Sequence, residues 1–544
     1  MSFVTPSGFR DILPDEALQR EQITQRVQSC LAERGYLPIE TPTLENIEVL
    51  NAAAELPGMP FRFFDAAGKL LALRPDVTMQ VARMCTTRLH GQSGPFRFRY
   101  KHRVFREASV ESSSREFTQL GAEVIGAAGG DVDAELVTLF AQSLEASGLK
   151  QFTIALGTAG VLRALLKAIP ADGDWKNQAL KAYQNSDFVE LDRLISLIDS
   201  DTPYAKAIGR LPRIFGGLDA IAQARALLSP LGCDDGLDEL EAVYQQMAAQ
   251  GRENMLLVDF SMMRSFNYYT GLVFEVYAPG LGEMIGSGGR YDTMLAAYDG
   301  TPRPSAGFAF SLEQVMAALA LQDNQALQRE ADRPLRIAVP KGSLNADTIR
   351  CLQRAGLDTS GLENPGRQLI ISNPGVDYII VRPTDAPIFV SLGAADCGIC
   401  GKDSLLEAQP NVVELVDLKF GGCRFVVAEP AGATPAVEAR YRKLGSIRVA
   451  SKYPRITQSY YDRMGMQVDI VQLHGNIELA PLTGMAERII DITATGTTLR
   501  ENNLAIVDDV LDSTARFFAN PCAFRMDRRI NELAIALKNQ VEEN

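Results

Sequence analysis

A short polar stretch divides this chain into two parts, and it constrains the fold more than any other feature of the sequence. Residues 322–334, QDNQALQREADRP, are polar and charged and end in Pro334. The segment before them, 312–321, is helix-like, and the LRIAV after them is typical of a short apolar strand. Composition breaks of this kind mark linkers between domains. We therefore predict one domain over 1–321, a linker over 322–334 and a second domain over 335–544.

The rest of the composition is that of an ordinary folded protein. The 544 residues suit roughly three to four domain-sized units at about 150 residues each, and 46% of them are hydrophobic. The longest apolar runs, such as 70–73 and 378–381, have the length of strands, whereas a membrane-spanning helix needs about 20 apolar residues. The N-terminus shows no basic segment followed by an apolar one, so we expect no secretory signal and no membrane partner. These features predict a cytoplasmic protein.

The cysteines and histidines argue against a structural zinc site. The chain has eight scattered cysteines and three histidines, His90, His102 and His474. Only Cys397 and Cys400 form a CxxC, and no histidine stands at a ligand spacing from them. We expect a reduced pair on a buried strand.

The charge balance argues against a nucleic-acid partner. The net charge is −13, of which −11 falls on the first 334 residues and −2 on the residues from Leu335 onward. Nucleic-acid binders normally carry a basic footprint. An acidic first part leaves only a local basic patch as an alternative.

The hydrophobic spacing predicts the elements of both parts. The first part should open with a helix that starts at Pro14 and stops at Gly35, with Ile23, Val27, Cys30 and Leu31 on one face. Strands are expected near 97–100, 123–125, 255–260 and 272–277, with a helical insertion over about 158–250. In the second part, strands fit 336–339, 369–372, 378–381, 412–416, 424–428, 446–450, 468–473 and 489–492, and helices fit 345–355, 388–392, 456–464 and 480–487. Such alternation indicates an α/β fold with a largely parallel sheet, which binds ligands at the carboxyl ends of its strands.

The sharpest local signal is the segment 489–499, IIDITATGTTL, in which a buried strand runs into hydroxyl residues around one glycine. Small side chains let backbone N–H groups approach a phosphate, and threonine hydroxyls add donors. The residues of this loop are Thr495, Gly496, Thr497 and Thr498. Asp491, at the strand end, could meet a sugar hydroxyl or the shell of a Mg²⁺ ion. The alternative is an ordinary strand–turn–helix connection with threonine caps, and the Walker A spacing is missing.

Three further polar loops follow predicted strands. They carry Lys341, Arg382 and the pair Lys402 and Asp403. Together with the threonine loop they suggest one crevice for polyanionic substrates, although each cation could equally be solvated. The few histidines offer no convincing Ser–His–Asp or Cys–His set.

The second part resembles the short form of the ATP phosphoribosyltransferase of histidine biosynthesis. The stretches that carry the resemblance are RIAVPKGSL, IIVRPTDAPIFVSLGAADCGICGKDSLLE, IRVASKYPRITQSYY and GNIELAPLTGMAERIIDITATGTTLRENNL. The most specific of them runs from Glu478 through Gly484 and Asp491 to the threonine loop. The resemblance implies a two-lobed fold like that of a periplasmic binding protein, with lobe I over about 335–428 and 511–544 and lobe II over about 429–510.

The same resemblance implies the reaction and its residues. This family joins 5-phosphoribose from phosphoribosyl pyrophosphate to N1 of the adenine of ATP and releases pyrophosphate. N1 carries a free lone pair, so no general base is obligatory, and the main demand is charge stabilisation by positioned cations and Mg²⁺. The family pattern assigns catalytic roles to Arg382 and Asp491. It assigns substrate binding to Lys341, Arg367, Asp403, Thr495, Gly496, Thr497 and Thr498. It names no metal ligand, because the family lacks the full acidic doublet of other phosphoribosyltransferases, and direct ligation of Mg²⁺ by the protein stays open.

The first part resembles a class II histidyl-tRNA synthetase core, an α+β domain with a mostly antiparallel sheet. The resemblance is carried by LRPDVT, VFRE, REFTQLGAE, RSFNYYTG, GGRYD and GFAFSLEQ. Three departures stand out. Glu313 is followed by Gln314 where the synthetases have an ATP-binding arginine, residues 265–267 read Ser-Phe-Asn where the synthetases have Gly-Leu-Asp, and no anticodon-binding domain is present. We therefore interpret the first part as a synthetase-derived regulatory subunit fused to its transferase. A genuine synthetase and a solute-binding module are the weaker alternatives.

The old amino-acid pocket is the expected site of histidine, the expected end-product inhibitor of such a first step. The positions that match histidine contacts in the synthetases are Asp76, Thr78, Arg106, Gln119, Glu123, Arg264 and Tyr269. The alternative is a scaffold that binds nothing. The expected partners are thus ATP, phosphoribosyl pyrophosphate and histidine, in a homo-oligomer without nucleic acid.

Overall fold

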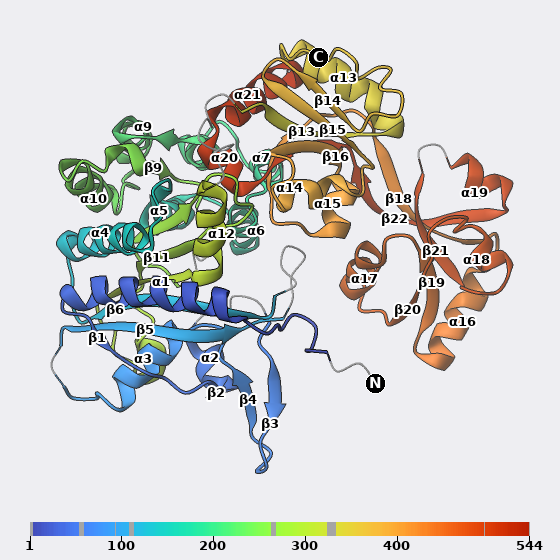
Figure 1. Ribbon diagram of the computed structural model, residues 1–544. Coiled ribbons are helices and arrows are strands. Elements are labelled where there is room, and N and C mark those ends of the chain that lie inside the picture. The colour runs from blue at the N-terminus through green and yellow to red at the C-terminus, as the bar shows by residue number, and fades with distance from the viewer. Residues whose placement is uncertain are drawn as a thin grey trace. The chain divides into compact units, whose positions relative to one another are not determined.

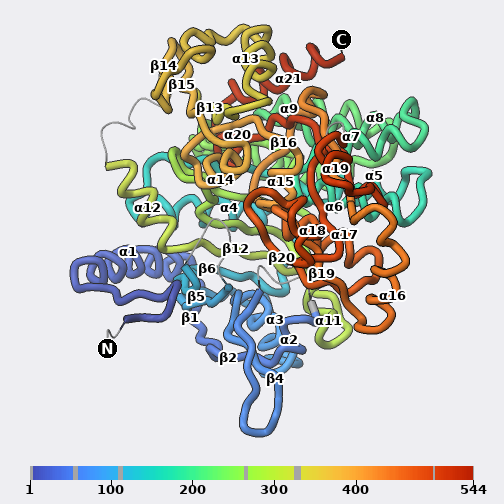
Figure 2. Tube along the Cα trace, turned by 90° about the vertical axis from the view of Figure 1, so that its right-hand side faces the viewer, coloured from blue at the N-terminus to red at the C-terminus, as the bar shows by residue number. Residues whose placement is uncertain are grey.

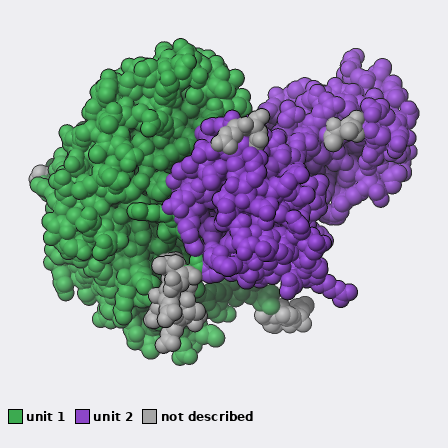
Figure 3. Space-filling view, turned by 90° about the horizontal axis from the view of Figure 1, so that it is seen from above, with its two compact units in different colours: residues 1–333, 521–528 green, residues 334–520, 529–544 purple. Residues whose placement is uncertain are grey.

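The computed structural model describes residues 4–53, 59–92, 94–107, 114–262, 268–323, 333–493 and 496–542. They form two compact units, which Figure 3 shows in separate colours. Unit 1 comprises Met1–Arg333 and Pro521–Arg528, and unit 2 comprises Pro334–Asn520 and Arg529–Asn544. The units divide at Arg333 and Pro334, where the predicted linker ends, and one short segment of the second part, Pro521–Arg528, packs as a piece of unit 1.

Unit 1 is built on a nine-stranded, mostly antiparallel sheet (Figure 1). In spatial order its strands are β1 (Leu37–Pro38), β5 (Phe96–Phe105), β6 (Glu116–Ile125), β12 (Ser305–Ser311), β11 (Gly286–Arg290), β10 (Leu272–Tyr277), β7 (Thr153–Thr158), β9 (Leu256–Asp259) and β8 (Phe215–Gly216). The β1–β5 and β7–β9 pairs are parallel. This sheet confirms the antiparallel α+β core expected for the first part.

Helices cover both faces of this sheet. One face packs against α1 (Pro14–Glu33), α4 (Gly130–Ser147), α9 (Leu218–Leu228), α10 (Leu237–Ala249) and α12 (Leu312–Gln322). The other packs against α3 (Thr78–Thr87), α5 (Ala159–Ala168), α6 (Gly173–Gln184), α7 (Phe188–Ile195) and α8 (Pro203–Arg210). Helix α1 buries Ile23, Val27 and Leu31 on one face, as its spacing predicts. The run α5–α10 is the expected helical insertion.

A small sheet completes unit 1. Its strands are β2 (Leu44–Asn46), β4 (Leu70–Leu73) and β3 (Arg62–Phe64), and Figure 2 shows the β4 end of this sheet projecting at the foot of the unit. The short helices α2 (Ile47–Ala53) and α11 (Ala296–Asp299) lie beside α3. The last helix of unit 1 is α20 (Pro521–Met526), contributed from far along the chain.

Unit 2 has two sheets, one for each lobe (Figure 1). Lobe I carries the order β14 (Ile370–Asn373), β15 (Val376–Val381), β13 (Leu335–Pro340), β16 (Cys397–Gly401), β23 (Ala515–Ala519) and β17 (Val413–Asp417). Lobe II carries β20 (Val468–Gln472), β19 (Ile447–Ser451), β21 (Arg488–Thr493), β18 (Cys423–Pro430) and β22 (Leu504–Ser513). The expectation of largely parallel sheets is wrong, because β16–β23, β17–β23, β18–β21, β18–β22 and β14–β15 are all antiparallel pairs.

The helices of unit 2 lie between these strands in the sequence. They are α13 (Asn345–Arg354), α14 (Ala386–Ser391), α15 (Lys402–Ala408), α16 (Thr434–Leu444), α17 (Pro454–Arg463), α18 (Leu479–Leu482), α19 (Thr497–Glu501) and α21 (Arg528–Glu542). Helix α18 is much shorter than the predicted 480–487, since Gly484 takes a left-handed φ of 71°. Cys397 and Cys400 form no disulfide and are buried on β16, as expected.

The chain crosses between the lobes twice. It leaves lobe I between β17 and β18 and returns at Thr514, between β22 and β23. Both β18 from Cys423 and β22 to Ser513 belong to the lobe II sheet, so lobe II extends beyond the predicted 429–510. Within the described residues, no helix combines the length and apolar character needed to cross a membrane.

Candidate functional site

Two predicted cations lie side by side at the carboxyl edge of the lobe I sheet. Strands β13 and β15 run parallel, with Pro340 beside Val381. The next residues are therefore Lys341 and Arg382, and the Lys341 amide donates to the Val381 carbonyl at 2.8 Å. Both side chains are exposed. The strand register alone brings these cations together.

Arg367 lies at the same edge of the sheet but is placed there by a different strand. Strand β14 runs antiparallel to β15, so its start lies beside the end of β15. The Ile380 amide donates to the Leu369 carbonyl at 2.8 Å, which places the exposed turn holding Arg367 beside this edge. Three cationic side chains thus belong to one sheet edge.

Strand β16 lies parallel to β13, and Asp403 follows it at the start of α15. Asp403 is buried, and its carboxylate accepts from the Ser513 hydroxyl at 2.8 Å while its amide donates to the same hydroxyl oxygen at 3.1 Å. A Cβ on Gly401 would lie 2.1 Å from the Asp403 carboxylate, so only glycine fits there. Lys402 is a correction: its ammonium pairs with Glu414 at 2.5 Å, so this charge is neutralised within lobe I.

Asp491 lies on β21 of lobe II and is partly buried. Burial is the main cause that raises its pKa to about 6, and the negative charge of Glu478 adds to the rise. The Ile492 amide, which donates to the carboxylate at 2.8 Å, and the ammonium of Lys452 act in the opposite direction. Glu478 was quoted in the predicted motif but not assigned to the site, and the structure adds it.

The threonine loop follows β21 directly. Gly496 has a left-handed φ of 70°, which favours glycine, and its amide donates to the Thr493 hydroxyl at 2.7 Å. Thr497 and Thr498 are exposed at the start of α19. Thr495 lies outside the described residues. The described part of the loop therefore offers two exposed hydroxyls beside a tight turn.

Tyr453 connects the two lobes of this site electrostatically. Burial raises the pKa of its phenol, and the negative charges of Asp403 and Asp491 raise it further. The pKa of this one tyrosine is thus affected by carboxylates from lobe I and from lobe II. Tyr453 lies in the stretch IRVASKYPRITQSYY, but no role is predicted for it from the sequence.

The described residues contain no group of three or more His, Cys, Asp or Glu side chains that could hold a metal ion. Mg²⁺ is commonly held by one or two carboxylates together with substrate phosphates.

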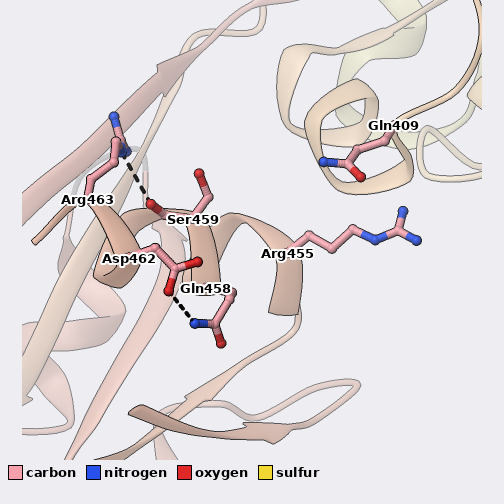
Figure 4. Close-up of a pocket in the computed structure, with 6 residues that line it drawn as sticks. All are labelled: Gln409, Arg455, Gln458, Ser459, Asp462 and Arg463. Carbon is pink, nitrogen blue, oxygen red and sulfur yellow. Dashed lines mark hydrogen bonds between the residues drawn. The ribbon is translucent and has the colours of Figure 1, made fainter. Parts of the chain in front are cut away.

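A surface groove of about 510 Å³ lies elsewhere in unit 2 (Figure 4). Its lining residues are Gln409, Arg455, Gln458, Ser459, Asp462 and Arg463, and none of them is a predicted site residue. Beside it the lobes are tied together. The Glu407 carboxylate accepts from the amides of Arg455 and Ile456 at 3.1 Å at the start of α17, while the Arg455 guanidinium donates to the carbonyls of Glu407 and Ala408 at 3.0 and 2.9 Å. Helices α15 and α17 thus cap each other.

Unit 1 holds a second cluster, built on the alternation of β6. Leu120, Ala122 and Val124 enter the hydrophobic core on one face. Gln119 and Glu123, on the other face, belong to the predicted histidine contacts. Successive strand residues point to opposite faces, so the two polar side chains share a side.

The structure joins four of the predicted contacts by hydrogen bonds. The Thr78 hydroxyl donates to Glu123 at 2.8 Å. The Gln119 amide nitrogen donates to Asp76 at 3.0 Å, and the Asp76 carboxylate also accepts from the Thr78 amide at 2.8 Å. The side-chain oxygen of Gln119 is buried without a hydrogen-bond partner in this structure. The cluster therefore has one acceptor available to a ligand.

Glu123 is the most perturbed carboxyl of this cluster. It is 1% exposed, and burial raises its pKa to about 8. Besides Thr78, the hydroxyls of Tyr100 (3.3 Å) and Tyr291 donate to it. Both tyrosines are additions to the predicted set, although Tyr291 belongs to the GGRYD motif. A Cβ on Gly307 would lie 1.7 Å from the Glu123 carboxylate, so the strand opposite must carry glycine.

The other predicted contacts border this cluster. Arg106 donates to the Pro75 carbonyl at 2.9 Å, and burial lowers its pKa while the neighbouring Asp76 opposes that shift. Tyr269 is buried and stacks on Tyr268 with ring centres 4.3 Å apart. Arg264 lies outside the described residues.

Gln314 occupies the position where the synthetases have an arginine. Its amide nitrogen donates to Glu283 at 2.8 Å. The preceding Glu313 accepts from the Thr118 amide at 2.9 Å and pairs with Arg20. Gln314 is thus engaged with Glu283, and Glu313 with Thr118 and Arg20, so no guanidinium is supplied from position 314.

Comparison with known proteins matches both parts. A family model described as histidyl-tRNA synthetase matches residues 8–315, and one described as ATP phosphoribosyltransferase matches residues 382–539. An ATP phosphoribosyltransferase from Rubrobacter xylanophilus is 50% identical over 194 residues, which cover 36% of this chain and 90% of that protein. An ATP phosphoribosyltransferase regulatory subunit from Moorella thermoacetica is 36% identical over 316 residues, which cover 58% of this chain and 81% of that protein.

Solved structures agree for the first part. A protein from Bacillus halodurans, described as an ATP phosphoribosyltransferase regulatory subunit/histidyl-tRNA synthetase, is 26% identical with a TM-score of 0.54 and covers 70% of this chain and 93% of that one. A histidyl-tRNA synthetase from Nostoc sp., at 22% identity and a TM-score of 0.52, covers 66% of this chain and 85% of that one and shares the fold.

Proposed function

The chain belongs to the histidyl-tRNA synthetase family over its first part and to the ATP phosphoribosyltransferase family over its second, and we infer from this that one polypeptide carries a transferase and its regulatory subunit. Its reaction is the condensation of ATP with phosphoribosyl pyrophosphate to N1-(5-phosphoribosyl)-ATP and pyrophosphate. The residue roles, the metal and the regulation set out below are proposals.

The observation that carries the catalytic proposal is the shared edge of Lys341, Arg382 and Arg367. When pyrophosphate leaves, negative charge grows on its oxygens and positive charge on the anomeric carbon of the ribose. Cations that the strand register gathers at one edge meet the first demand. Arg382 acts on the departing pyrophosphate, while Lys341 and Arg367 hold the polyphosphates. N1 of adenine attacks with its own lone pair, so this edge needs no base.

Lobe II supplies the ribose side of the site. Asp491 faces the ribose, where its carboxylate accepts a hydroxyl and offsets the positive charge at the anomeric carbon. The loop from Thr495 to Thr498 binds the 5-phosphate through hydroxyls and backbone amides. Asp403 orients the nucleotide from lobe I. Mg²⁺, carried by the substrate oxygens, supplies charge neutralisation to the pyrophosphate.

Unit 1 is the histidine sensor in this proposal. Histidine brings an ammonium, a carboxylate and an imidazole. The cluster offers a carboxylate in Asp76, a carboxyl that burial keeps largely protonated in Glu123 and a guanidinium in Arg106. The unpartnered oxygen of Gln119 supports a ligand with a donor at this point. Gln314, bound to Glu283, supports the loss of aminoacylation, so we propose neither a tRNA nor another nucleic-acid partner. A cytoplasmic homo-oligomer with Mg²⁺ completes the proposal.

The catalytic proposal is tested by incubating the purified protein with ATP, phosphoribosyl pyrophosphate and Mg²⁺ and measuring phosphoribosyl-ATP. Arg382→Ala is compared with Arg442→Ala, which removes an exposed arginine of lobe II. We expect loss of turnover in the first variant and wild-type turnover in the second. Equal turnover in both would show that the lobe I edge is not the reacting site.

The sensing proposal is tested by calorimetric titration of histidine into the wild type and into Gln119→Ala, with Lys181→Ala, an exposed position on α6, as the control. We expect binding to the wild type and control and weaker binding to the Gln119 variant. Equal affinities in all three would place the histidine site elsewhere.

A further inference from the structure

The segment Pro521–Arg528 has an unusual place in the chain. It lies between β23 and α21, which both belong to unit 2, yet it packs as part of unit 1. The chain therefore passes between the units after Arg333, after Asn520 and after Arg528. A segment that leaves its own domain and becomes buried in another is a physical link between them.

Arg525 is the centre of this packing. The side chains of Arg525 and Asp259 are 3% and 2% exposed, and the Arg525 Nε donates to Asp259 at 2.7 Å. The guanidinium lies 5.2 Å from the centre of the Tyr277 ring, and its Nη1 donates to the Pro521 carbonyl at 3.1 Å. A guanidinium so placed combines an ion pair with a cation–π contact.

Apolar contacts also hold the segment in unit 1. We call the buried place that receives Arg525, lined by Asp259 and Tyr277, the socket. Cys522 packs in a buried cluster with Ala155, Met262 and Tyr277. Phe524 meets Phe215 with ring centres 5.9 Å apart. The segment is therefore buried on several sides rather than laid across a surface.

The socket adjoins the part of the sequence that carries two of the predicted histidine contacts. Asp259 is the last residue of β9, and its second carboxylate oxygen accepts from the amide and hydroxyl of Ser261 at 2.7 and 2.6 Å. Arg264 and Tyr269 follow within ten positions along the chain. Tyr277 ends β10, the strand that follows Tyr269. The socket is thus attached to both strands that flank this part of the predicted pocket.

We propose that the Asp259–Arg525 pair is a positioning contact that transmits occupancy of the histidine pocket to the transferase unit. The inference rests on the proposed histidine site. A ligand that contacts Tyr269 bears on β10, and the ring of Tyr277 at the far end of that strand lies against Arg525. Arg525 in turn sits on a segment joined at both ends to unit 2. Its described hydrogen bonds go to Asp259 and Pro521 and not to predicted substrate residues, so it acts through position alone.

The contrasting possibility is an anchor that only stabilises unit 1. Thermodynamic linkage between histidine and phosphoribosyl pyrophosphate distinguishes such an anchor from a coupling contact. If histidine and phosphoribosyl pyrophosphate are coupled, each changes the affinity of the other by the same factor, typically about 5- to 150-fold. An anchor without a coupling role leaves that factor unchanged when it is weakened.

The experiment measures the Kd of histidine by calorimetry with and without saturating phosphoribosyl pyrophosphate, in the full chain. The variants are Arg525→Met, Arg525→Lys and the control Arg97→Met, which removes a different ion pair of unit 1, with Glu135. The fluorescence of Trp175, the one tryptophan of the chain, checks that unit 1 is folded. Turnover without histidine is measured alongside.

We expect the ratio of the two Kd values to fall towards one in Arg525→Met, with uninhibited turnover within about twofold of wild type, and to stay unchanged in Arg97→Met. If Arg525→Met does not fold, Arg525→Lys serves as the test. This variant keeps the positive charge but loses the planar guanidinium, so it should lower the ratio of the two Kd values in part. A wild-type ratio in the folded Arg525 variants overturns the inference while leaving histidine sensing intact. Absence of histidine binding to the wild type overturns the sensing proposal itself.

Discussion

Replacing Glu123 by glutamine should change how the stability of unit 1 depends on pH. Burial raises the pKa of Glu123 from 4.5 to about 8, so the folded protein holds a proton there that the unfolded chain releases above its lower pKa. The free energy of unfolding therefore falls as the pH rises from about 4.5 to about 8 and levels off above that. The glutamine side chain of the variant cannot ionise, and its oxygen can still accept from Thr78.

The magnitude follows from the displacement of the pKa. At about 1.4 kcal/mol per unit, the whole shift corresponds to roughly 5 kcal/mol. The part lost between pH 6 and pH 9 is about 2–3 kcal/mol, because most of the titration of the folded form lies in that interval. Glu123→Gln should therefore gain about that much stability relative to the wild type when the pH is raised from 6 to 9.

Trp175 provides the assay. It is buried in unit 1, in the same hydrophobic cluster as Tyr100 and Tyr291, and its indole N–H donates to the Leu194 carbonyl. Urea unfolding followed by tryptophan fluorescence therefore reports on unit 1 alone. The control is Glu116→Gln, a partly exposed position on the same strand that pairs with Arg103.

One result of this comparison would refute the reasoning about Glu123. If the stability difference between Glu123→Gln and the wild type is the same at pH 6 and pH 9, Glu123 does not retain its proton in the folded state. A pH-dependent gap of equal size in Glu116→Gln would assign the effect to surface charge instead.

Four further outcomes are expected. Gly496→Val should lower turnover by about 100-fold or more and weaken phosphoribosyl pyrophosphate binding, because the left-handed φ is strained for valine and the phosphate donors are displaced. Kinetics and calorimetry measure the two effects, and normal binding would show that the loop does not hold the phosphate. The acid limb of kcat/KM should have an apparent pKa near 6, set by ionisation of Asp491, and Glu478→Gln should move it to lower pH because one negative neighbour is removed; an unmoved limb would assign it to another group. Arg382→Ala should lower kcat more than it raises KM, and Arg382→Lys should rescue poorly; a change in KM alone would make Arg382 a binding residue. Transfer RNA should not be charged with histidine, because Gln314 donates to Glu283 and supplies no guanidinium; Mg²⁺-dependent charging of labelled histidine would refute this.

Periodic elements were predictable and aperiodic ones were not. The apolar stripe of α1 identifies its buried face, and the strands β13 and β15 appear as apolar runs followed by polar loops. Strand β16, CGICG, is buried at all five positions and shows no alternation, so its cysteines were expected on a buried strand but its bounds and its partners in the sheet were not predicted. Strand β22 is exposed over much of its length, which hides it from a search for apolar runs. Both make the antiparallel pairs that the parallel expectation missed.

The site residues also differ in whether a local sequence pattern could predict their place. Lys341 and Arg382 were predictable because adjacent parallel strands end at one edge. The ion pair of Lys402 could not be predicted because its partner, Glu414, comes from another strand, and only the folded sheet brings the two together. The burial of Arg525 in unit 1 likewise depends on Asp259, 266 positions earlier in the chain. No local pattern encodes contacts of that range.

The mutual capping of α15 and α17 has a consequence for how unit 2 moves. Domain closure on microsecond-to-millisecond timescales uses a few fixed points about which rigid bodies rotate. Pulling α15 away from α17 would break the hydrogen bonds of both helix ends, at about 0.5–2 kcal/mol for each cap. A rotation pivoting on Glu407 and Arg455 breaks none of them. Breathing of the lobes should therefore leave the amides of Arg455 and Ile456 slow to exchange with deuterium, even while amides elsewhere along the cleft exchange quickly.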